Sequence, residues 1–256
     1  MRLALLAIGA VCMSAMACGA EDAPRPNLLH VTGVVDVSSS QDVGGGGGLE
    51  WFRAISPAWG FTVGGYSYRF ADSHWGFGRV GGFYNVLDWT ILSATADVGG
   101  GRFEREVSAY QLYRAGVLQA VLPKRLYVSV EEQYARYARL EEPLLKAGLV
   151  VYPTRSLALQ GHYYTSTGGN VDSQFVSGRV DWDPGPFALL AGARVGRAAV
   201  EPPERAAVQP RAVDTHEGFA GVAVPLGEHV FRLVFTVTDQ STVTRYRTDI
   251  GWTIRF

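Results

Sequence analysis

The sequence predicts an all-β protein: an antiparallel up-and-down transmembrane β-barrel of roughly fourteen strands, within a range of about twelve to sixteen. Three observations predict it: a two-faced C-terminal segment, strand-like segments along the whole chain, and connections that alternate in length. Strand side chains point alternately to opposite sides. One apolar face and one charged face therefore suit a wall between hydrocarbon and water.

The segment from Thr244 to Phe256 shows the two faces most clearly. Its even-numbered residues end in Trp252, Ile254 and Phe256 and are mostly apolar or aromatic, whereas its odd-numbered residues are mostly charged. A soluble sheet would bury the apolar face in a protein core. An outer-membrane barrel turns that face to lipid and the charged face to a wet lumen.

Segments of similar character fill the rest of the chain. Short breaks rich in Gly, Pro and Asp separate them, as turn geometry favours. An even strand number is typical of single-chain bacterial outer-membrane barrels. We expect strands at 28–38, 48–56, 60–70, 75–86, 89–98, 107–120, 125–137, 144–152, 156–166, 174–183, 187–197, 216–225, 229–238 and 243–256.

The predicted connections fall into two alternating sets. Bacterial barrels have short periplasmic turns and longer outer loops, so the alternation predicts both termini in the periplasm. The short set is 57–59, 87–88, 122–124, 153–155, 183–186 and 226–228, and the longer set is 39–47, 71–74, 99–106, 138–143, 167–173, 198–215 and 239–242.

The N-terminal residues predict an export signal. Residues 1–20 combine a basic Arg2, a short apolar run and a small-residue cleavage site, with a cut after Ala17 or after Ala20. Residues 21–27 then form a short flexible periplasmic segment, and 28–256 form the barrel.

Cysteine use and charge narrow the functional classes. Both cysteines, Cys12 and Cys18, lie in or beside the leader, so no disulfide is expected in the mature chain. Acylation of Cys18 stays open as an alternative. The formal net charge of −1 gives no global field that would favour nucleic acid. No apolar run after the leader reaches the length of a membrane helix, so a membrane form must be a closed barrel.

The charged residues of the strands are the candidate functional residues. On the predicted faces they point inward, where they either pair across strands or line water. The lumen-lining candidates are Arg79, Asp97, Glu131, Lys146, Arg179, Asp181, Arg194, Arg232, Arg245, Arg247 and Asp249, with Asp36 and Arg255 on the same face.

Three of these arginines fall on the last two strands. Arg232, Arg245 and Arg247 predict a basic ladder, with Asp36 nearby across the closing seam. Such a ladder would attract anions in an open pore or neutralise acids opposite it, and the sequence leaves both roles open.

Two glycine-rich motifs do not predict nucleotide binding. Gly76 to Gly81 matches G-x-G-x-x-G, but strand patterns surround it and the required helix is missing, so we expect a thin, bent strand. The run Gly44–Gly48 lacks the Lys-Ser/Thr of a phosphate loop, and we interpret it as a mobile outer loop.

Asp72, Ser73 and His74 place three triad residue types side by side. A working triad needs converging side chains, which neighbours in one loop rarely provide. An outer-membrane lipid hydrolase that uses Ser73, His74 or His162 is nevertheless kept as an alternative. No cluster of His, Cys and Asp has the spacing of a metal site. We expect no cofactor.

The chain resembles the YaiO-type outer-membrane β-barrel family. The resemblance covers nearly the whole mature chain and rests on the tyrosine-rich strands at 65–68 and 161–164, the segment 144–148 and the end 250–256. It implies an outer-membrane location and a barrel fold, and it implies no catalytic residues. It also implies that the barrel-assembly machinery recognises the terminal strand, with Trp252 and Phe256 as the signal.

Together these observations predict a non-enzymatic outer-membrane barrel of a Gram-negative cell envelope, either a narrow porin-like passive pore or an accessory protein. A lipid hydrolase and a soluble secreted β-protein are the alternatives. The expected partners are outer-membrane lipids, lipopolysaccharide and the barrel-assembly machinery, with an envelope or polysaccharide partner left open.

Overall fold

The computed structural model describes residues 27–40, 42–70, 73–87, 89–103, 106–137, 140–199, 212–240 and 243–256. The predicted leader and both cysteines lie outside these residues. No helix among the described residues is long and apolar enough to cross a membrane.

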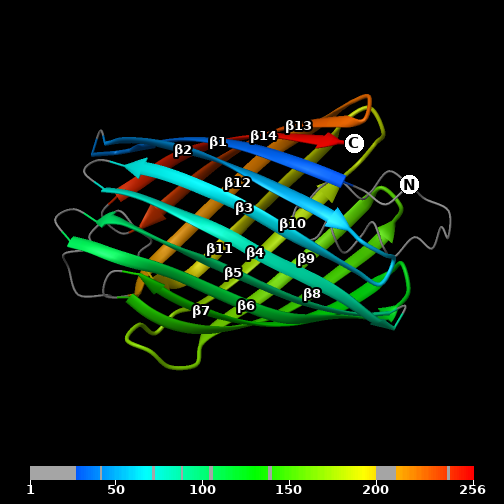
Figure 1. Ribbon diagram of the computed structural model, residues 1–256, viewed down its shortest axis with the longest axis horizontal. Coiled ribbons are helices and arrows are strands. Elements are labelled where there is room, and N and C mark those ends of the chain that lie inside the picture. Colours follow the sequence, from blue (N-terminus) through cyan, green and yellow to red (C-terminus); the bar gives the residue numbers. More distant parts are fainter. Residues whose placement is uncertain are drawn as a thin grey trace.

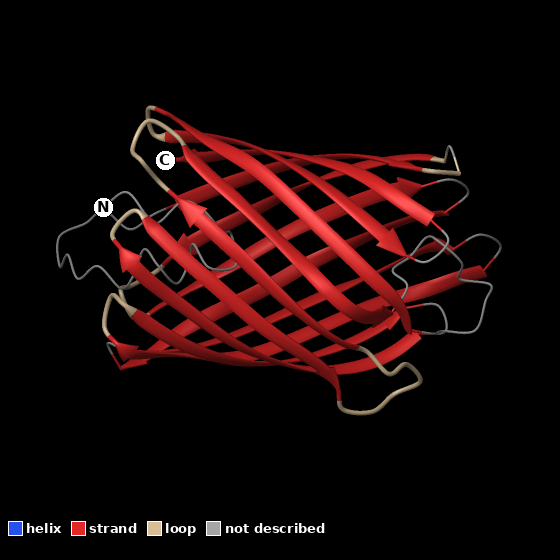
Figure 2. Ribbon diagram, turned by 180° about the vertical axis from the view of Figure 1, so that it is seen from behind, coloured by secondary structure: helices blue, strands red, loops and turns tan. Residues whose placement is uncertain are grey.

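The described chain folds into fourteen antiparallel strands that form one closed barrel. Each strand pairs with its neighbours in sequence, and the strands run obliquely around the barrel (Figures 1 and 2). The strands are β1 (Asn27–Ser38), β2 (Val43–Ala54), β3 (Trp59–Phe70), β4 (Ser73–Leu87), β5 (Thr90–Phe103), β6 (Glu106–Leu122), β7 (Leu126–Tyr137), β8 (Leu140–Thr154), β9 (Leu157–Ser166), β10 (Gln174–Trp182), β11 (Ala188–Ala199), β12 (Ala212–Leu226), β13 (His229–Gln240) and β14 (Val243–Arg255).

The first and last strands close the barrel. β1 pairs antiparallel with β14 from Leu28↔Arg255 to Ser38↔Arg245. No strand edge is left unpaired in this closed order, so the backbone groups of every strand have partners on both sides. The predicted fold class and strand number are confirmed.

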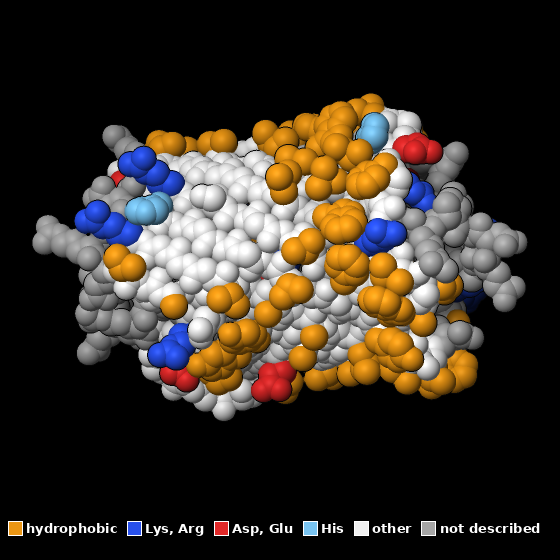
Figure 3. Space-filling model, viewed as in Figure 1, with side chains coloured by type: hydrophobic (Ala, Val, Ile, Leu, Met, Phe, Trp, Pro, Cys, Tyr) orange, Lys and Arg blue, Asp and Glu red, His pale blue; other side chains and the backbone are white. Residues whose placement is uncertain are grey.

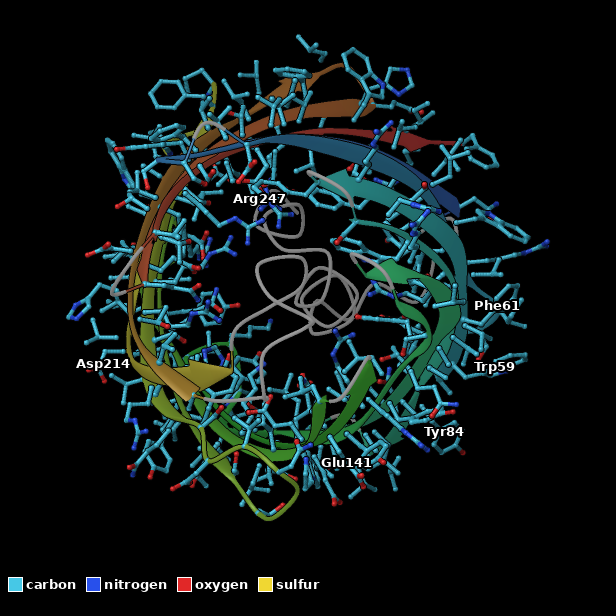
Figure 4. All side chains as sticks on the ribbon, turned by 90° about the vertical axis from the view of Figure 1, so that its left-hand side faces the viewer. Trp59, Phe61, Tyr84, Glu141, Asp214 and Arg247 are labelled. Atoms are coloured by element: carbon cyan, nitrogen blue, oxygen red, sulfur yellow. The ribbon has the colours of Figure 1, made fainter. Side chains whose placement is uncertain are left out.

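The barrel carries apolar side chains on its outer surface and charged side chains in its interior, the reverse of a soluble protein. Large apolar side chains such as Val35, Leu49 and Val80 are exposed on the outside, whereas Asp36 and Asp97 are fully buried. Figure 4 shows Trp59, Phe61 and Tyr84 outside the ring of strands and Arg247 inside it. Strand alternation then assigns the remaining side chains to an inner wall or an outer face.

The two ends of the barrel differ in their connections. The turn end carries the connections β2–β3, β4–β5, β6–β7, β8–β9, β10–β11 and β12–β13, and the loop end carries β1–β2, β3–β4, β5–β6, β7–β8, β9–β10, β11–β12 and β13–β14. Gly227 adopts φ 66° in the tight β12–β13 turn, a conformation that glycine reaches without strain. Exposed aromatic residues ring the outer face near the turn end: Trp59, Tyr84, Trp89, Trp182, Phe187 and Trp252.

The predicted difference in connection length is smaller than expected. At the loop end only the β9–β10 and β11–β12 connections span more residues between strands than the β10–β11 connection of the turn end does. The predicted strands stopped short of this rim, since β5 continues past residue 98 to Phe103 and β8 begins before residue 144, at Leu140. Ladder hydrogen bonds to neighbouring strands hold the rim backbone extended even where the apolar alternation has stopped.

The prediction of a mobile loop at Gly44–Gly48 is wrong. These glycines lie within β2 and pair with both β1 and β3. Gly44, Gly46 and Gly48 face inward beside aromatic rings of β3, and a Cβ on Gly48 would lie 2.3 Å from Cδ1 of Tyr66. The glycines are therefore needed for close packing rather than for loop flexibility. The motif Gly76–Gly81 lies within β4, as predicted, and no helix follows it.

Candidate functional site

The candidate site is the charged inner wall of the barrel. All eleven predicted lumen-lining candidates lie on the inward-facing side of their strands, by the alternation that places Arg247 inside. Between the rims, the described inner wall carries equal numbers of basic and acidic side chains. They are Arg79, Arg114, Lys146, Arg179, Arg194, Arg232, Arg245 and Arg247, and Asp36, Glu50, Asp97, Glu131, Glu142, Asp181, Glu217 and Asp249.

A first network crosses β2 to β6. Arg79 donates to Asp97 through Nε at 2.6 Å and through Nη2 at 2.8 Å, and its Nη1 lies 3.0 Å from Oε2 of Glu50. Arg114 lies 3.6 Å from the same Asp97, and the hydroxyl of Tyr66 donates to Glu50. A bidentate arginine–carboxylate pair of this kind fixes geometry as well as charge. The network joins five strands through side chains.

A second network closes the seam between β1 and β14. Arg245 donates through Nη2 to Oδ2 of the fully buried Asp36 at 2.7 Å, and Tyr68 donates to the same oxygen at 2.6 Å. The guanidinium carbon of Arg245 also lies 5.0 Å from the ring centre of Phe70. Asp36 therefore lies beside the last strand, as predicted. Arg245 belongs to an ion pair rather than to a free basic ladder.

Two further pairs form within single strands. Arg247 donates to Asp249 two residues along β14 at 2.7 Å, and Arg179 donates to Asp181 two residues along β10 at 2.6 Å. Inner-wall side chains repeat every second residue, so positions i and i+2 are neighbours on that face. Each pair neutralises itself on its own strand.

Arg232 is the exception among the predicted basic residues. It lies opposite Gly251 on β14, and among the described residues it forms no salt bridge. The predicted ladder is thus two neutralised arginines and one unbridged arginine. Of the two roles left open by the sequence, neutralising neighbouring acids fits Arg245 and Arg247, and an unbridged positive charge fits Arg232.

Aromatic rings connect the charges on the opposite wall. The Nζ of Lys146 lies 3.8 Å from Glu131 and 5.7 Å from the ring centre of Tyr164. Tyr164 stacks on Phe175 with ring centroids 4.2 Å apart. Arg194 continues the row, with its guanidinium 5.2 Å from the Phe175 ring and 3.1 Å from Glu217. Cation–π contacts and ion pairs alternate along β7 to β12.

The sequence reasoning missed four charged residues of this wall. Glu50, Arg114, Glu142 and Glu217 all face inward, and each takes part in an ion pair or a hydrogen bond. Most of them lie on strands whose inner face mixes glycine and aromatic residues with the charges, which hides the polar–apolar alternation. Strand alternation could have found Glu50, because it lies two positions from Gly48 and therefore on the same face of the strand.

The candidate hydrolase residues do not converge. Ser73 is buried on the inner face of β4, whereas His74 follows it directly and is exposed on the outer face. His162 lies on the inner face of β9, and Asp72 lies outside the described residues. No triad can form between adjacent residues that point to opposite faces. No group of His, Cys, Asp and Glu among the described residues could hold a metal ion.

The residues of the predicted assembly signal lie on the outside at the turn end. Trp252 is exposed on β14 and packs edge-on against Phe231 with ring centroids 5.9 Å apart. Phe256 is also exposed. Both are accessible from the lipid side, and their role in assembly stays a prediction.

No protein-family model and no curated protein sequence matches the chain. Solved structures do match over nearly its whole length. The CymD monoaromatic hydrocarbon channel has a TM-score of 0.69 at 12% identity and covers 98% of this chain and 94% of its own. The P. putida toluene transporter TodX has a TM-score of 0.64 at 10% identity and covers 91% of each chain. At these identities the comparison establishes the fold, which is that of outer-membrane β-barrel channels.

The KdgM porin in complex with disordered oligogalacturonate is more distant. Its TM-score is 0.50 at 8% identity, and the match covers 87% of this chain and 98% of the porin. These three matches are two channels and a porin, and at these identities they establish a shared barrel architecture.

Proposed function

We propose that the protein is a non-enzymatic passive pore of the bacterial outer membrane that admits small hydrophilic solutes. One observation carries the proposal: the inner wall is charged around the barrel, whereas the outer face is apolar with an aromatic girdle at the turn end. Hydrocarbon outside and water inside account for both surfaces. We further propose that the turn end and both termini lie in the periplasm, because bacterial barrels have short periplasmic turns.

The inner wall favours hydrophilic rather than hydrocarbon cargo. Asp36 and Asp97 are fully buried in arginine pairs, and Arg247 and Asp249 remain partly exposed in the interior. An apolar solute would have to displace water from such charges and return no hydrogen bonds, which is unfavourable. Polar solutes would replace the water contacts.

We further infer kinship with YaiO-type barrels and recognition of β14 by the barrel-assembly machinery. The tyrosine-rich strands support the first inference, since Tyr66, Tyr68 and Tyr164 are structural members of the inner wall. The exposed Trp252 and Phe256 support the second.

Single-channel recording in planar lipid bilayers tests the pore. The wild-type barrel should give discrete conductance steps, and purified folded protein without any conductance would contradict the proposal. Selectivity is tested with the double variant Arg232→Gln/Arg247→Gln, because these positions carry the unbridged and the most exposed inner-wall arginines. Arg245 is avoided, because it holds the buried Asp36.

The reversal potential in a salt gradient should move toward cation preference in this double variant, since two positive charges leave the inner wall. Arg197→Gln is the matched control, because Arg197 is an exposed outer-face arginine opposite Asp214 at the loop end. The same reversal potential in all three proteins would mean that the inner charges do not act on the permeating ions.

A further inference from the structure

The unbridged Arg232 lies on the inner wall toward the turn end of β13. Its side chain is half-buried, and no described residue forms a hydrogen bond or an ion pair with it. Its guanidinium nitrogens are not fully buried, so they are open to the lumen. A charge that has lost part of its water without gaining a partner is unfavourable. The guanidinium is therefore ready to receive an anion.

The acids around Arg232 are held by other side chains. Asp181 and Asp249 are the carboxylates whose charges attract it. Asp181 accepts a hydrogen bond from Arg179 at 2.6 Å, and Asp249 accepts one from Arg247 at 2.7 Å. Neither carboxylate contacts Arg232, so its donors stay available.

His30 of β1 supplies a second unused donor beside Arg232. Its Nδ1 lies 3.0 Å from Oγ1 of Thr253. When that hydroxyl donates to Nδ1, the neutral ring carries its proton on Nε2. The side chain is only 9% exposed, yet Nε2 is not fully buried and has no hydrogen-bond partner among the described residues. The ring therefore offers one N–H group to the lumen.

Arg232 and His30 border one small space above Gly251. Gly251 of β14 lies opposite Arg232, and β14 lies between β1 and β13 (Figure 1). A Cβ added to Gly251 would lie 3.1 Å from Cε1 and 3.6 Å from Nε2 of His30, and 3.7 Å from Cβ of Arg232. The missing side chain leaves room between the two donors. We call Arg232, His30 and Gly251 the Arg–His site.

The surroundings of the Arg–His site strengthen its charge. Val230 and Val234 flank Arg232 on the same face of β13, and each is 5% exposed. An apolar setting makes a charged hydrogen bond stronger than it is in bulk water. On the outside, apolar side chains gather on the front face toward the turn end (Figure 3). A hydrophilic ligand would thus reach the site through the lumen rather than through lipid.

We propose that the Arg–His site binds the carboxylate group of small, singly charged solutes inside the pore. The guanidinium fork of Arg232 matches the two oxygens of a carboxylate, and Nε2 of His30 adds a third donor. Glu50 lies opposite His30, and with Asp181 and Asp249 it makes a second negative charge on the ligand unfavourable. This inference rests on the proposed pore and names the class of solute that it takes.

The first test titrates the folded barrel in detergent with acetate, followed by saturation-transfer NMR. Acetamide is the comparison ligand, because it has the same shape and no charge. Acetamide should bind roughly tenfold more weakly to wild type, and Arg232→Gln should weaken acetate binding by a similar factor, as expected for lost charge-assisted hydrogen bonds. Arg197→Gln, which removes an exposed outer-face arginine, should bind acetate as wild type does.

Three results would overturn the proposal: no measurable acetate binding, equal binding of acetate and acetamide, or unchanged acetate binding by Arg232→Gln. Competition then checks the class of anion. Formate should displace acetate better than inorganic phosphate does, and stronger displacement by phosphate would also overturn the carboxylate assignment. Heat-modifiable migration in gels confirms that each variant is folded.

The second test fills the space. Gly251→Ala should fold, because only a small shift of the His30 ring is needed, yet bind acetate several-fold more weakly. Gly33→Ala on the outer face of β1 is the matched control, since nothing lies within 4 Å of its Cβ. Equal acetate binding by the two variants would overturn the site. His30→Phe should weaken acetate binding by about fivefold, as expected for one lost neutral donor.

Equilibrium binding separates this inference from the proposed pore. A barrel that conducts ions but does not bind acetate would refute the Arg–His site and leave the pore standing. A barrel that binds acetate as described but never conducts would refute the pore and leave the binding site standing.

Discussion

Replacing Asp97 with asparagine should destabilise the barrel strongly. Asp97 is fully buried and accepts two hydrogen bonds from Arg79, at 2.6 and 2.8 Å, while Arg114 lies 3.6 Å away. Breaking a buried ion pair typically costs about 3–5 kcal/mol. Arg79 is partly exposed and keeps Glu50 at 3.0 Å, so we expect a loss of about 2–3 kcal/mol in the free energy of unfolding.

Urea unfolding of the barrel in lipid vesicles, followed by heat-modifiable migration, measures this loss. With a denaturant slope of roughly 2 kcal/mol per molar, the midpoint should fall by about 1–1.5 M. Asp239→Asn is the control, because Asp239 is exposed on the outer face and accepts only from Thr244 among the hydrogen bonds found. Its urea midpoint should change little, because a surface substitution of this kind alters the free energy of unfolding by no more than about 0.5 kcal/mol.

A double-mutant cycle with Arg79→Gln then tests the pairing itself. Asp97→Asn and Arg79→Gln should be non-additive by about 1–3 kcal/mol, since both remove the same contact. If Asp97→Asn shifts the midpoint no more than Asp239→Asn does, or if the two changes simply add, the inner ion pairs do not hold these strands together.

Two other predictions concern packing and membrane depth. Gly48→Val should destabilise the barrel by at least about 2 kcal/mol, because its Cβ would lie 2.3 Å from Tyr66. Gly33→Val is the control and should be neutral, since a Cβ there meets nothing within 4 Å. Equal urea midpoints for the two variants would contradict the packing argument. Lipids brominated near the headgroup should quench the tryptophan fluorescence more than lipids brominated near the chain end, because aromatic girdles lie at the membrane interface. The exposed tryptophans concerned are Trp59, Trp89, Trp182 and Trp252. Stronger quenching by the deep bromine would refute a girdle at the turn end.

The fold was predictable because one physical rule governs almost every strand. Alternation alone located β14 and β9, and closure of an up-and-down barrel then required β1 to lie beside β14, which brought Asp36 near the last strand. The partner of Asp36 could not be predicted, because the register between first and last strand depends on the stagger of the whole barrel. In the structure Asp36 forms its ion pair with Arg245.

The glycines show where the rule fails. A glycine run weakens an isolated strand, so Gly44–Gly48 suggested a loop. In the barrel the missing side chains of Gly46 and Gly48 make room for Tyr68 and Tyr66, a cross-strand relation that a single stretch of sequence does not contain. The same pairing hid Glu50, whose partner Tyr66 donates to it from the next strand.

The pairing of β1 with β14 has a consequence for biogenesis. Among the described strands, the earliest in the chain, β1, bonds along Leu28 to Ser38 with the latest, β14. Until β14 is available, any partly assembled sheet presents two bare rims that can recruit other chains. Closure is therefore the final step and joins the most widely separated parts of the polypeptide, which makes it slow. The chain must be kept apart from its copies during that delay, so its folding yield should fall as the concentration of unfolded chain rises.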